Sequence, residues 1–356
     1  MILALATELA QVVLPRGSVD FPAVWPPAGL LLGALVAVDR RQWLWPIGLT
    51  VAIVGMSALA HDAWPLQALV TALTTAVQGS VGAWLLLRYR PSGFTLNRVG
   101  DAFGLVGVAF AVSVVGAVAP ALAGRADVSI AWRVWALSAA LGIVLFTPLL
   151  IAWRTEWDAR REVFTTLRII ELAIAVAAAA VVAQLVFGAM VPRVFQFPAF
   201  MLPFFIWGAF RFGPAGNSLM MLVICLVGGA HTMTGAGPLA MPQIDLSILR
   251  GQAASALAAY SFLLLASVVA ERRETELDRN RLVAELQGAL AEIKTLRGLI
   301  PICAWCHKVR DDADVWQRLE TYLDANTDAT FSHSICPSCV EKQHAAEHPA
   351  AQPWKI

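Results

Sequence analysis

Long uncharged apolar runs recur along most of this 356-residue chain and constrain its fold more than any other feature. The clearest run is 253–270, AASALAAYSFLLLASVVA, which is about long enough to cross a bilayer core. Comparable runs occur at 2–14, 22–38, 43–60, 65–87, 101–122, 130–153, 169–190, 197–212, 216–235 and 250–270. Backbone polar groups in lipid must be satisfied within the segment, which favours helices. We therefore predict an all-α polytopic membrane protein with eight to ten transmembrane segments, some of the shorter runs being half-spans.

Arginines distinguish the two sides of this membrane. Residues 1–270 hold 15 Arg, no Lys and 11 acidic residues, whereas 271–356 hold 11 basic and 14 acidic residues. Arginine-rich breaks alternate with breaks that carry one Arg or none, and the rich ones lie at 39–41, 88–98, 154–168, 211 and 272–273. By the positive-inside rule we expect these breaks, and the chain after 270, to be cytoplasmic. The net charge of +1 provides no basic surface, so we expect no nucleic-acid partner.

Three stretches resemble the membrane-associated sensor domain of the first type, over about residues 15–272. They are WPPAGLLLGALVAVDRRQWLWPIGL, WRVWALSAALGIVLFTPLLIAW and RFGPAGNSLMMLVICLVGGAHTMTGAGPL. The resemblance implies a multi-pass receptor of a bacterial inner membrane, in which the membrane module signals to a cytoplasmic kinase or cyclic-dinucleotide enzyme through a helix. The output enzymes usual in that family have no counterpart in the residues after 270. We therefore expect a sensor without catalytic activity of its own.

The two motifs that carry most of this resemblance are Trp25-Pro26-Pro27-Ala28-Gly29 and Arg211-Phe212-Gly213. Paired prolines free backbone groups that must be satisfied by protein or by a water-filled cavity. Trp25, Pro26, Pro27 and Arg211 are therefore candidate ligand-pocket residues. The alternative is a kink that only shapes helix packing.

The segment after the last apolar run reads as a charged helix, ERRETELDRNRLVAELQGALAEIKTLRGLI. Its apolar residues alternate at spacings of three and four, at Val283, Leu286, Leu290, Ile293 and Ile300. This pattern predicts a coiled-coil linker over 271–298 and a possible homodimer through 276–300. A monomeric helix that packs on its own tail is the alternative.

Four of the five cysteines form two C-x2-C pairs in the tail, Cys303/Cys306 and Cys336/Cys339. Two such pairs can present four thiolates to one zinc ion, so we predict a zinc-ribbon-like module over 299–342. Residues 299–342 also resemble a small module found at the C-terminal end of bacterial sensor, receiver and kinase proteins. We expect one apolar helical face between the pairs, from Val315 to Leu323, and a disordered tail over 343–356.

Other chemistry for these cysteines stays open at this point. A dithiol redox switch is the main rival to zinc. His307 completes a C-x-x-C-H haem-attachment pattern, but the expected cytoplasmic placement argues against haem. His307 and His333 are expected to be spectators, and Cys225 a packing residue within the membrane.

These patterns divide the chain into a membrane domain at 1–270, the linker at 271–298, the cysteine module at 299–342 and the tail. We expect the membrane domain to relay a small-molecule or membrane signal to a cytoplasmic partner such as a kinase or regulator. The alternatives are a transporter-like protein with a metal- or redox-responsive regulatory tail, and a receptor that has lost its output domain.

Overall fold

The computed structural model describes residues 3–4, 6–8, 22–90, 93–123, 127–159, 166–188, 190–297, 300–326, 331–332 and 334–347. The chain divides into two compact units, Met1–Leu277 and Asp278–Ile356, and each is described by itself. The predicted first segment at 2–14 lies mostly outside the described residues.

The first unit is a bundle of helices, which confirms the predicted all-α polytopic class. The helices are α2 (Pro26–Ala37), α3 (Leu44–Ala60), α4 (Pro65–Tyr89), α5 (Val99–Gly116), α6 (Val118–Ala123), α7 (Val128–Ala159), α8 (Thr166–Phe187), α9 (Leu202–Met233) and α10 (Ile244–Arg297). Short 3-10 turns lie at η1 (Arg40–Gln42), η2 (Arg193–Phe195) and η3 (Pro198–Met201). Among the described residues, seven helical stretches are long and apolar enough to cross a membrane.

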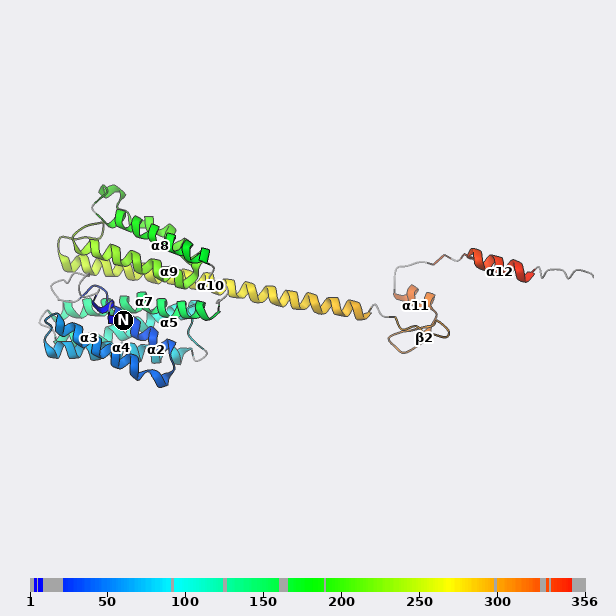
Figure 1. The fold of residues 1–356 in the computed structure, drawn as a ribbon, viewed down its shortest axis with the longest axis horizontal. Helices are drawn as coiled ribbons and strands as arrows, with labels where there is room; N and C mark the ends of the chain where they lie inside the picture. The colour runs from blue at the N-terminus through cyan, green and yellow to red at the C-terminus, as the bar shows by residue number, and fades with distance from the viewer. Residues whose placement is uncertain are drawn as a thin grey trace, which may run out of the picture. The chain divides into compact units, whose positions relative to one another are not determined.

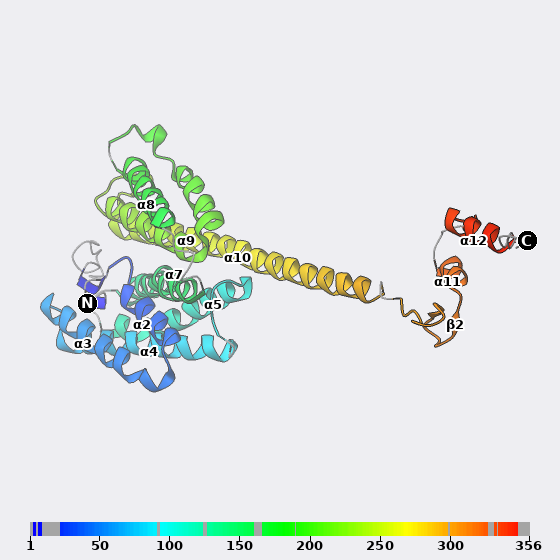
Figure 2. The same ribbon diagram turned by 45° about the vertical axis from the view of Figure 1, so that its right-hand side comes forward.

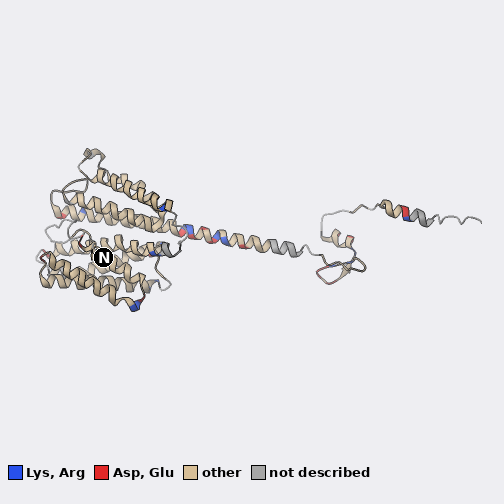
Figure 3. Ribbon diagram, viewed as in Figure 1, with Lys and Arg blue, Asp and Glu red and all other residues tan. Residues whose placement is uncertain are grey.

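Helix α7 runs through the middle of the bundle, with α2 to α5 on one side and α8 to α10 on the other (Figures 1 and 2). Large apolar side chains remain exposed on the outward faces of the surrounding helices, for example Leu69 on α4 and Ile174 on α8. The Arg residues of this unit gather mainly at the end from which α10 leaves the bundle (Figure 3). An apolar belt with charges at its ends is the surface expected of a membrane-spanning bundle.

Helix α2 is short and buried. Its 12 residues extend about 18 Å at 1.5 Å per residue, less than the ~30 Å of a bilayer core. Pro26 and Pro27 occupy its first turn, where a missing N–H costs nothing. This helix is therefore a half-span that other helices enclose, as its length and prolines suggested.

Helices α2 and α7 meet backbone to backbone at two glycines. A Cβ atom added to Gly142 would lie 1.9 Å from the carbonyl oxygen of Trp25, and one added to Gly29 would lie 2.1 Å from that of Gly142. Only glycine fits such an approach. The contact fixes the position of the Trp25-Pro26-Pro27 break against the central helix.

Helix α9 is two helices joined by a sharp turn. Gly213 has φ 66° and ψ −160°, and Pro214 starts the second arm. A Cβ added to Gly208 would lie 3.6 Å from Cα of Asn217, although nine positions of straight helix would separate the two residues by about 13 Å. The arms therefore fold back on each other, which confirms the break predicted between the runs 197–212 and 216–235.

The second unit contains the end of α10, a small hairpin and two short helices. Strands β1 (Val309–Arg310) and β2 (Trp316–Gln317) pair antiparallel, followed by α11 (Leu319–Asn326) and α12 (Pro337–Glu347). The carboxylate of Asp311 closes the hairpin by accepting hydrogen bonds from the backbone N–H groups of Ala313 and Val315, at 3.0 and 2.9 Å.

Two local expectations for this unit were wrong. Residues 315–317 are not part of a helix, because the Asp311-centred turn places Trp316 in a strand, so the predicted apolar helical face begins only at Leu319. Helix α12 also continues to Glu347, past the predicted start of the disordered tail at 343. Residues 348–356 lie outside the described part of the chain.

Candidate functional site

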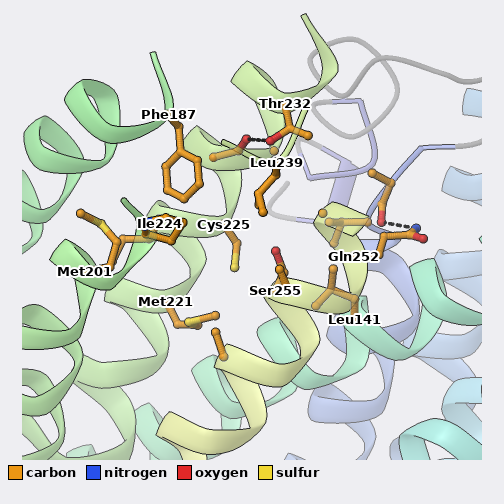
Figure 4. Close-up of a pocket in the computed structure, with 18 of the residues that line it drawn as sticks. Leu141, Phe187, Met201, Met221, Ile224, Cys225, Thr232, Leu239, Gln252 and Ser255 are labelled. Atoms are coloured by element: carbon orange, nitrogen blue, oxygen red, sulfur yellow. Dashed lines mark hydrogen bonds between the residues drawn. The ribbon is translucent and has the colours of Figure 1, made fainter. Parts of the chain in front are cut away.

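A cavity of about 200 Å³ lies between the second arm of α9, the start of α10, the end of α8 and the segment before α2 (Figure 4). It is at the end of the bundle opposite the point where α10 leaves. The lining residues are mainly apolar or small: Ala23, Val24, Leu141, Phe187, Pro198, Met201, Phe205, Met221, Ile224, Cys225, Gly228, Gly229, Thr232, Leu239, Ser247, Ile248, Gly251, Gln252, Ala254, Ser255 and Ala258. Glycines and alanines leave this space because they have little or no side chain to fill it.

Few polar groups line the cavity, and most of them are already bonded within the protein. The Thr232 hydroxyl donates to the carbonyl oxygen of Gly228 at 2.7 Å, and that of Ser247 bonds to the backbone of Met241. The amide nitrogen of Gln252 donates to the carbonyl oxygen of Ala23 at 2.8 Å. The amide oxygen of Gln252 is buried and has no hydrogen-bond partner in the described part of the chain.

Helix α10 supplies one continuous wall of this cavity. Its lining residues are 247, 248, 251, 252, 254, 255 and 258, which recur at spacings of three and four and therefore share one helical face. Cys225 on α9 and Ser255 on α10 both line the cavity. Helix α10 is therefore in direct contact with this space.

At the other end of the bundle, which we call the arginine end, charged residues join α8, α9 and α10. Arg211 forms a bidentate ion pair with Glu171, with both N···O distances at 2.7 Å. Arg168 donates to the carbonyl oxygen of Arg211 at 3.0 Å, and Arg273 of α10 donates to that of Phe210. The Arg211-Phe212-Gly213 turn is thus held by a neighbouring helix and by α10.

The loop between α4 and α5 holds α10 from another side at the arginine end. The hydroxyl of Ser267 donates to the carbonyl oxygen of Leu96 at 2.8 Å. The carboxylate of Glu271 accepts from the N–H of Val99 at 2.9 Å, and that of Glu274 accepts from the amide of Asn97 at 2.8 Å. These bonds link the last membrane turns of α10 to the rest of the bundle.

The candidate pocket residues from the sequence are not brought together. Trp25 is fully buried, and its indole nitrogen donates to the Thr75 hydroxyl at 3.0 Å. Pro26 and Pro27 pack in the interior at the start of α2. Arg211 lies at the arginine end. None of the four lines the cavity described above, and their contact with a ligand stays a prediction.

The break before α2 is satisfied by α7 rather than by a cavity. The Ser138 hydroxyl donates to the carbonyl oxygen of Pro22 at 2.6 Å, and the backbone N–H of Trp25 donates to that of Ser138 at 3.1 Å. Thr147 donates to the carbonyl oxygen of Gly29 at 3.0 Å. These bonds favour the packing interpretation of the double proline.

In the second unit, the first cysteine pair sits on a closed turn. The N–H of Cys303 donates to the carbonyl oxygen of Lys308 at 2.8 Å, and the N–H of His307 donates to that of Cys303 at 2.9 Å. His307 has φ 55°, a left-handed conformation that histidine tolerates better than most residues. Backbone N–H groups of Cys306 and Trp305 lower the pKa of Cys303 below its usual range.

The second pair lies at the start of α12. Cys336 precedes the helix, and its Sγ lies 3.2 Å from the hydroxyl oxygen of Ser338. The hydrogen bond from Ser338, with the thiol and backbone N–H of Cys339, lowers the pKa of Cys336 to about 7. Turn and helix start thus both favour thiolate, the form that binds metal.

The donor set fits zinc, since four thiolates complete a tetrahedral site. The described residues do not assemble it, because no three His, Cys, Asp or Glu side chains among them gather closely enough to hold a metal ion. His333 lies outside the described residues. The zinc site therefore stays a prediction.

Comparison with known families gives one match, to the family model MASE1 over residues 2–274. The chain belongs to the MASE1 family. This is a family of membrane sensor domains, so the bundle is a sensor domain, and the resemblance predicted from the sequence is confirmed. No curated protein and no solved structure matches the chain.

The MASE1 match ends just after Arg273, so it includes the cavity and the contacts at the arginine end but not the cysteine pairs. Sequence analysis placed Cys225 as a packing residue and missed the other cavity residues. The sequence signal for these residues is a pattern of small side chains on two consecutive helical segments. The first segment carries Gly228 and Gly229, and the second carries Gly251, Ala254 and Ala258. Such patterns also occur in tightly packed helices, so they do not distinguish a cavity from a contact.

Proposed function

We propose that this MASE1 protein is a receptor of a bacterial inner membrane whose membrane bundle controls α10, and that α10 passes the signal to a cytoplasmic partner through the cysteine module. The observation that carries the proposal is the continuity of α10. The helix walls the cavity from Ser247 to Ala258 and extends without a break to Arg297. A helix transmits rotation or translation over its length because its backbone hydrogen bonds keep it stiff.

A proline in the linker tests this relay. Leu286 lies on an exposed part of α10, so Leu286→Pro interrupts the helix at a cost of about 3 kcal/mol without disturbing the bundle. Leu286→Ala is the matched control, since alanine keeps the helix. The tagged full chain is recovered from membranes of its host, and the proteins bound to it are quantified by mass spectrometry. We expect the recovery of a signalling partner to change more in the proline variant than in Leu286→Ala, which removes the same seam side chain but keeps the helix. Equal partner recovery with the wild type, Leu286→Pro and Leu286→Ala would mean that α10 only connects the two units and does not transmit a signal.

We propose that the linker forms a parallel dimer with a second copy of the chain. Every described side chain from Glu271 to Leu290 is exposed, including the apolar residues Leu282, Val283, Leu286 and Leu290. Apolar residues at spacings of three and four are typical of coiled-coil seams. Ile293 and Ile300 were also predicted in this seam, and the side chain of Ile293 lies outside the description.

We propose a cytoplasmic C-terminus, and the arginine end supports this orientation. The bundle gathers Arg90, Arg168, Arg211 and Arg273 at the end from which α10 leaves, which supports a cytoplasmic C-terminus. A fluorescent-protein fusion after Lys342 should fluoresce, and an alkaline-phosphatase fusion at the same point should be inactive. An active phosphatase would reverse the orientation.

We propose that Cys303, Cys306, Cys336 and Cys339 bind one structural zinc, which gathers the two pairs. Zinc binding contributes on the order of 10 kcal/mol to the folding of small modules, and a closed four-thiolate site leaves no position for a substrate water. The purified full chain should contain one equivalent of zinc, and Cys336→Ser should lose it. Cys225→Ser is the control, because Cys225 is buried in the bundle. A full chain without zinc, in which all four tail thiols react with a thiol reagent, would favour the redox alternative.

A further inference from the structure

The cavity beside α10 has room for a small molecule. Its volume of about 200 Å³ exceeds the ~150 Å³ of an engineered apolar cavity that binds benzene in another protein. The space lies within the bundle and is lined by seven separate stretches of the chain, from the segment before α2 to α10. A ring with one short substituent therefore fits without displacing a helix.

The chemistry of the wall selects against charge. None of the lining residues is Asp, Glu, Lys, Arg or His. The hydroxyl groups of Thr232 and Ser247 donate hydrogen bonds to backbone carbonyl oxygens that are close to them in the sequence. An ion in such a site would lose its hydration without gaining a partner. The amide oxygen of Gln252 is unpaired among the described residues, but it is buried and exposes no surface to the cavity, so it adds no polar partner for a ligand.

We propose that this cavity binds a small, neutral, mainly apolar molecule of about the size of a substituted benzene. The inference names the ligand class for the proposed sensing function. Binding itself does not depend on how the signal leaves the bundle. Because α10 forms one wall, an occupant contacts the same helix that continues into the linker.

A matched pair of substitutions distinguishes the cavity from the lipid-facing surface. Ala254 lines the cavity, whereas its neighbour Ala253 is exposed and does not line it. Ala254→Leu fills the space, and Ala253→Leu adds the same atoms towards lipid. Ala258→Leu fills the cavity from one turn further along α10 and serves if the Ala254 variant does not fold.

The probes are benzyl alcohol, benzoate and benzylammonium, which share a ring and differ in charge. Each is radiolabelled and measured by equilibrium dialysis against the full chain in phospholipid nanodiscs, with binding to empty nanodiscs subtracted. We expect one saturable site for benzyl alcohol in the wild type and in Ala253→Leu. The affinity for benzyl alcohol should be at least tenfold lower in Ala254→Leu and Ala258→Leu. Benzoate and benzylammonium should show no saturable site.

Three results would overturn the proposal. They are the lack of saturable benzyl alcohol binding in the wild type, equal binding by the charged probes, and equal binding in the Ala253 and Ala254 variants. A further measurement tests whether the cavity holds a lipid chain: the lipid that remains bound to the washed protein is extracted and identified. A fatty acid or phospholipid that the wild type and Ala253→Leu retain and Ala254→Leu loses would assign the cavity to a lipid chain instead. If benzyl alcohol binds but Leu286→Pro leaves partner recovery unchanged, the ligand-binding proposal stands and the proposed signal relay through α10 is rejected.

Discussion

The two halves of α10 have the same backbone and opposite surroundings. Up to Ser267, residues such as Ile248, Gln252 and Leu263 are buried against other helices of the bundle. From Glu271 to Leu290 every side chain is exposed. The apolar residues of this half are not buried against any other described part of the chain. One half is therefore positioned by the bundle, whereas the apolar stripe of the other half is exposed. The transition falls at the arginine end, where Ser267, Glu271 and Glu274 are bonded to the α4–α5 loop.

The largest expected contrast comes from one leucine in each half. Leu263 is 4% exposed and Leu286 is 64% exposed. Leu263→Ala should destabilise the bundle by about 2–5 kcal/mol through lost packing contacts. Leu286→Ala should leave the bundle's stability unchanged and weaken only self-association. Thermal unfolding in detergent measures the first effect and analytical ultracentrifugation the second. Equal loss of bundle stability in both variants would mean that the linker packs on the bundle.

A second contrast uses glycine. Gly142→Ala places a methyl group against the carbonyl oxygen of Trp25, whereas a Cβ at Gly288 meets nothing within 4 Å. We expect about 1–3 kcal/mol of destabilisation for Gly142→Ala, because the crossing of α2 and α7 must open. Gly288→Ala should stabilise the linker helix by up to about 1 kcal/mol. Thermal unfolding and circular dichroism of the full chain report both, and a neutral Gly142→Ala would contradict the close α2–α7 contact.

The smallest contrast concerns two hydroxyl groups near the transition. Ser267 is buried and bonded to Leu96, whereas Thr275 bonds only to Glu271 one turn earlier on the exposed surface. Ser267→Ala should cost about 0.5–1.5 kcal/mol, and Thr275→Ala should cost less than that. Hydrogen exchange of residues 94–99 should rise in the Ser267 variant alone. Unchanged exchange there would show that this bond does not hold the loop.

Much of the fold was predictable because apolar runs and arginine breaks report on the bilayer directly. The break at Arg211-Phe212-Gly213 gave the division of α9, and Pro26-Pro27 gave the short α2. The cavity was not predictable, because it depends on which of many small residues face each other across helices. The Glu171–Arg211 pair was missed for the same reason. Its two residues are 40 positions apart along the chain.

The second unit shows the opposite balance. The two cysteine pairs are evident from spacing alone, yet the helix predicted between them gives way to a hairpin around Asp311. Hydrogen bonds from an aspartate side chain to the nearby backbone compete with helix formation, and the spacing of apolar residues gives no information about such bonds. The zinc that would join the pairs stays a prediction.

The central claim is that an occupant of the cavity changes the linker through α10. A nitroxide coupled to a keto-bearing amino acid at Gln287, which is exposed, leaves all cysteines untouched. Pulsed electron spin resonance then measures the distance between the labels of two copies in nanodiscs, with and without benzyl alcohol. The account predicts a distance distribution that shifts with benzyl alcohol in the wild-type background and stays fixed in Ala254→Leu. An unchanged distribution in a sample whose cavity is filled, as shown by dialysis, would contradict it.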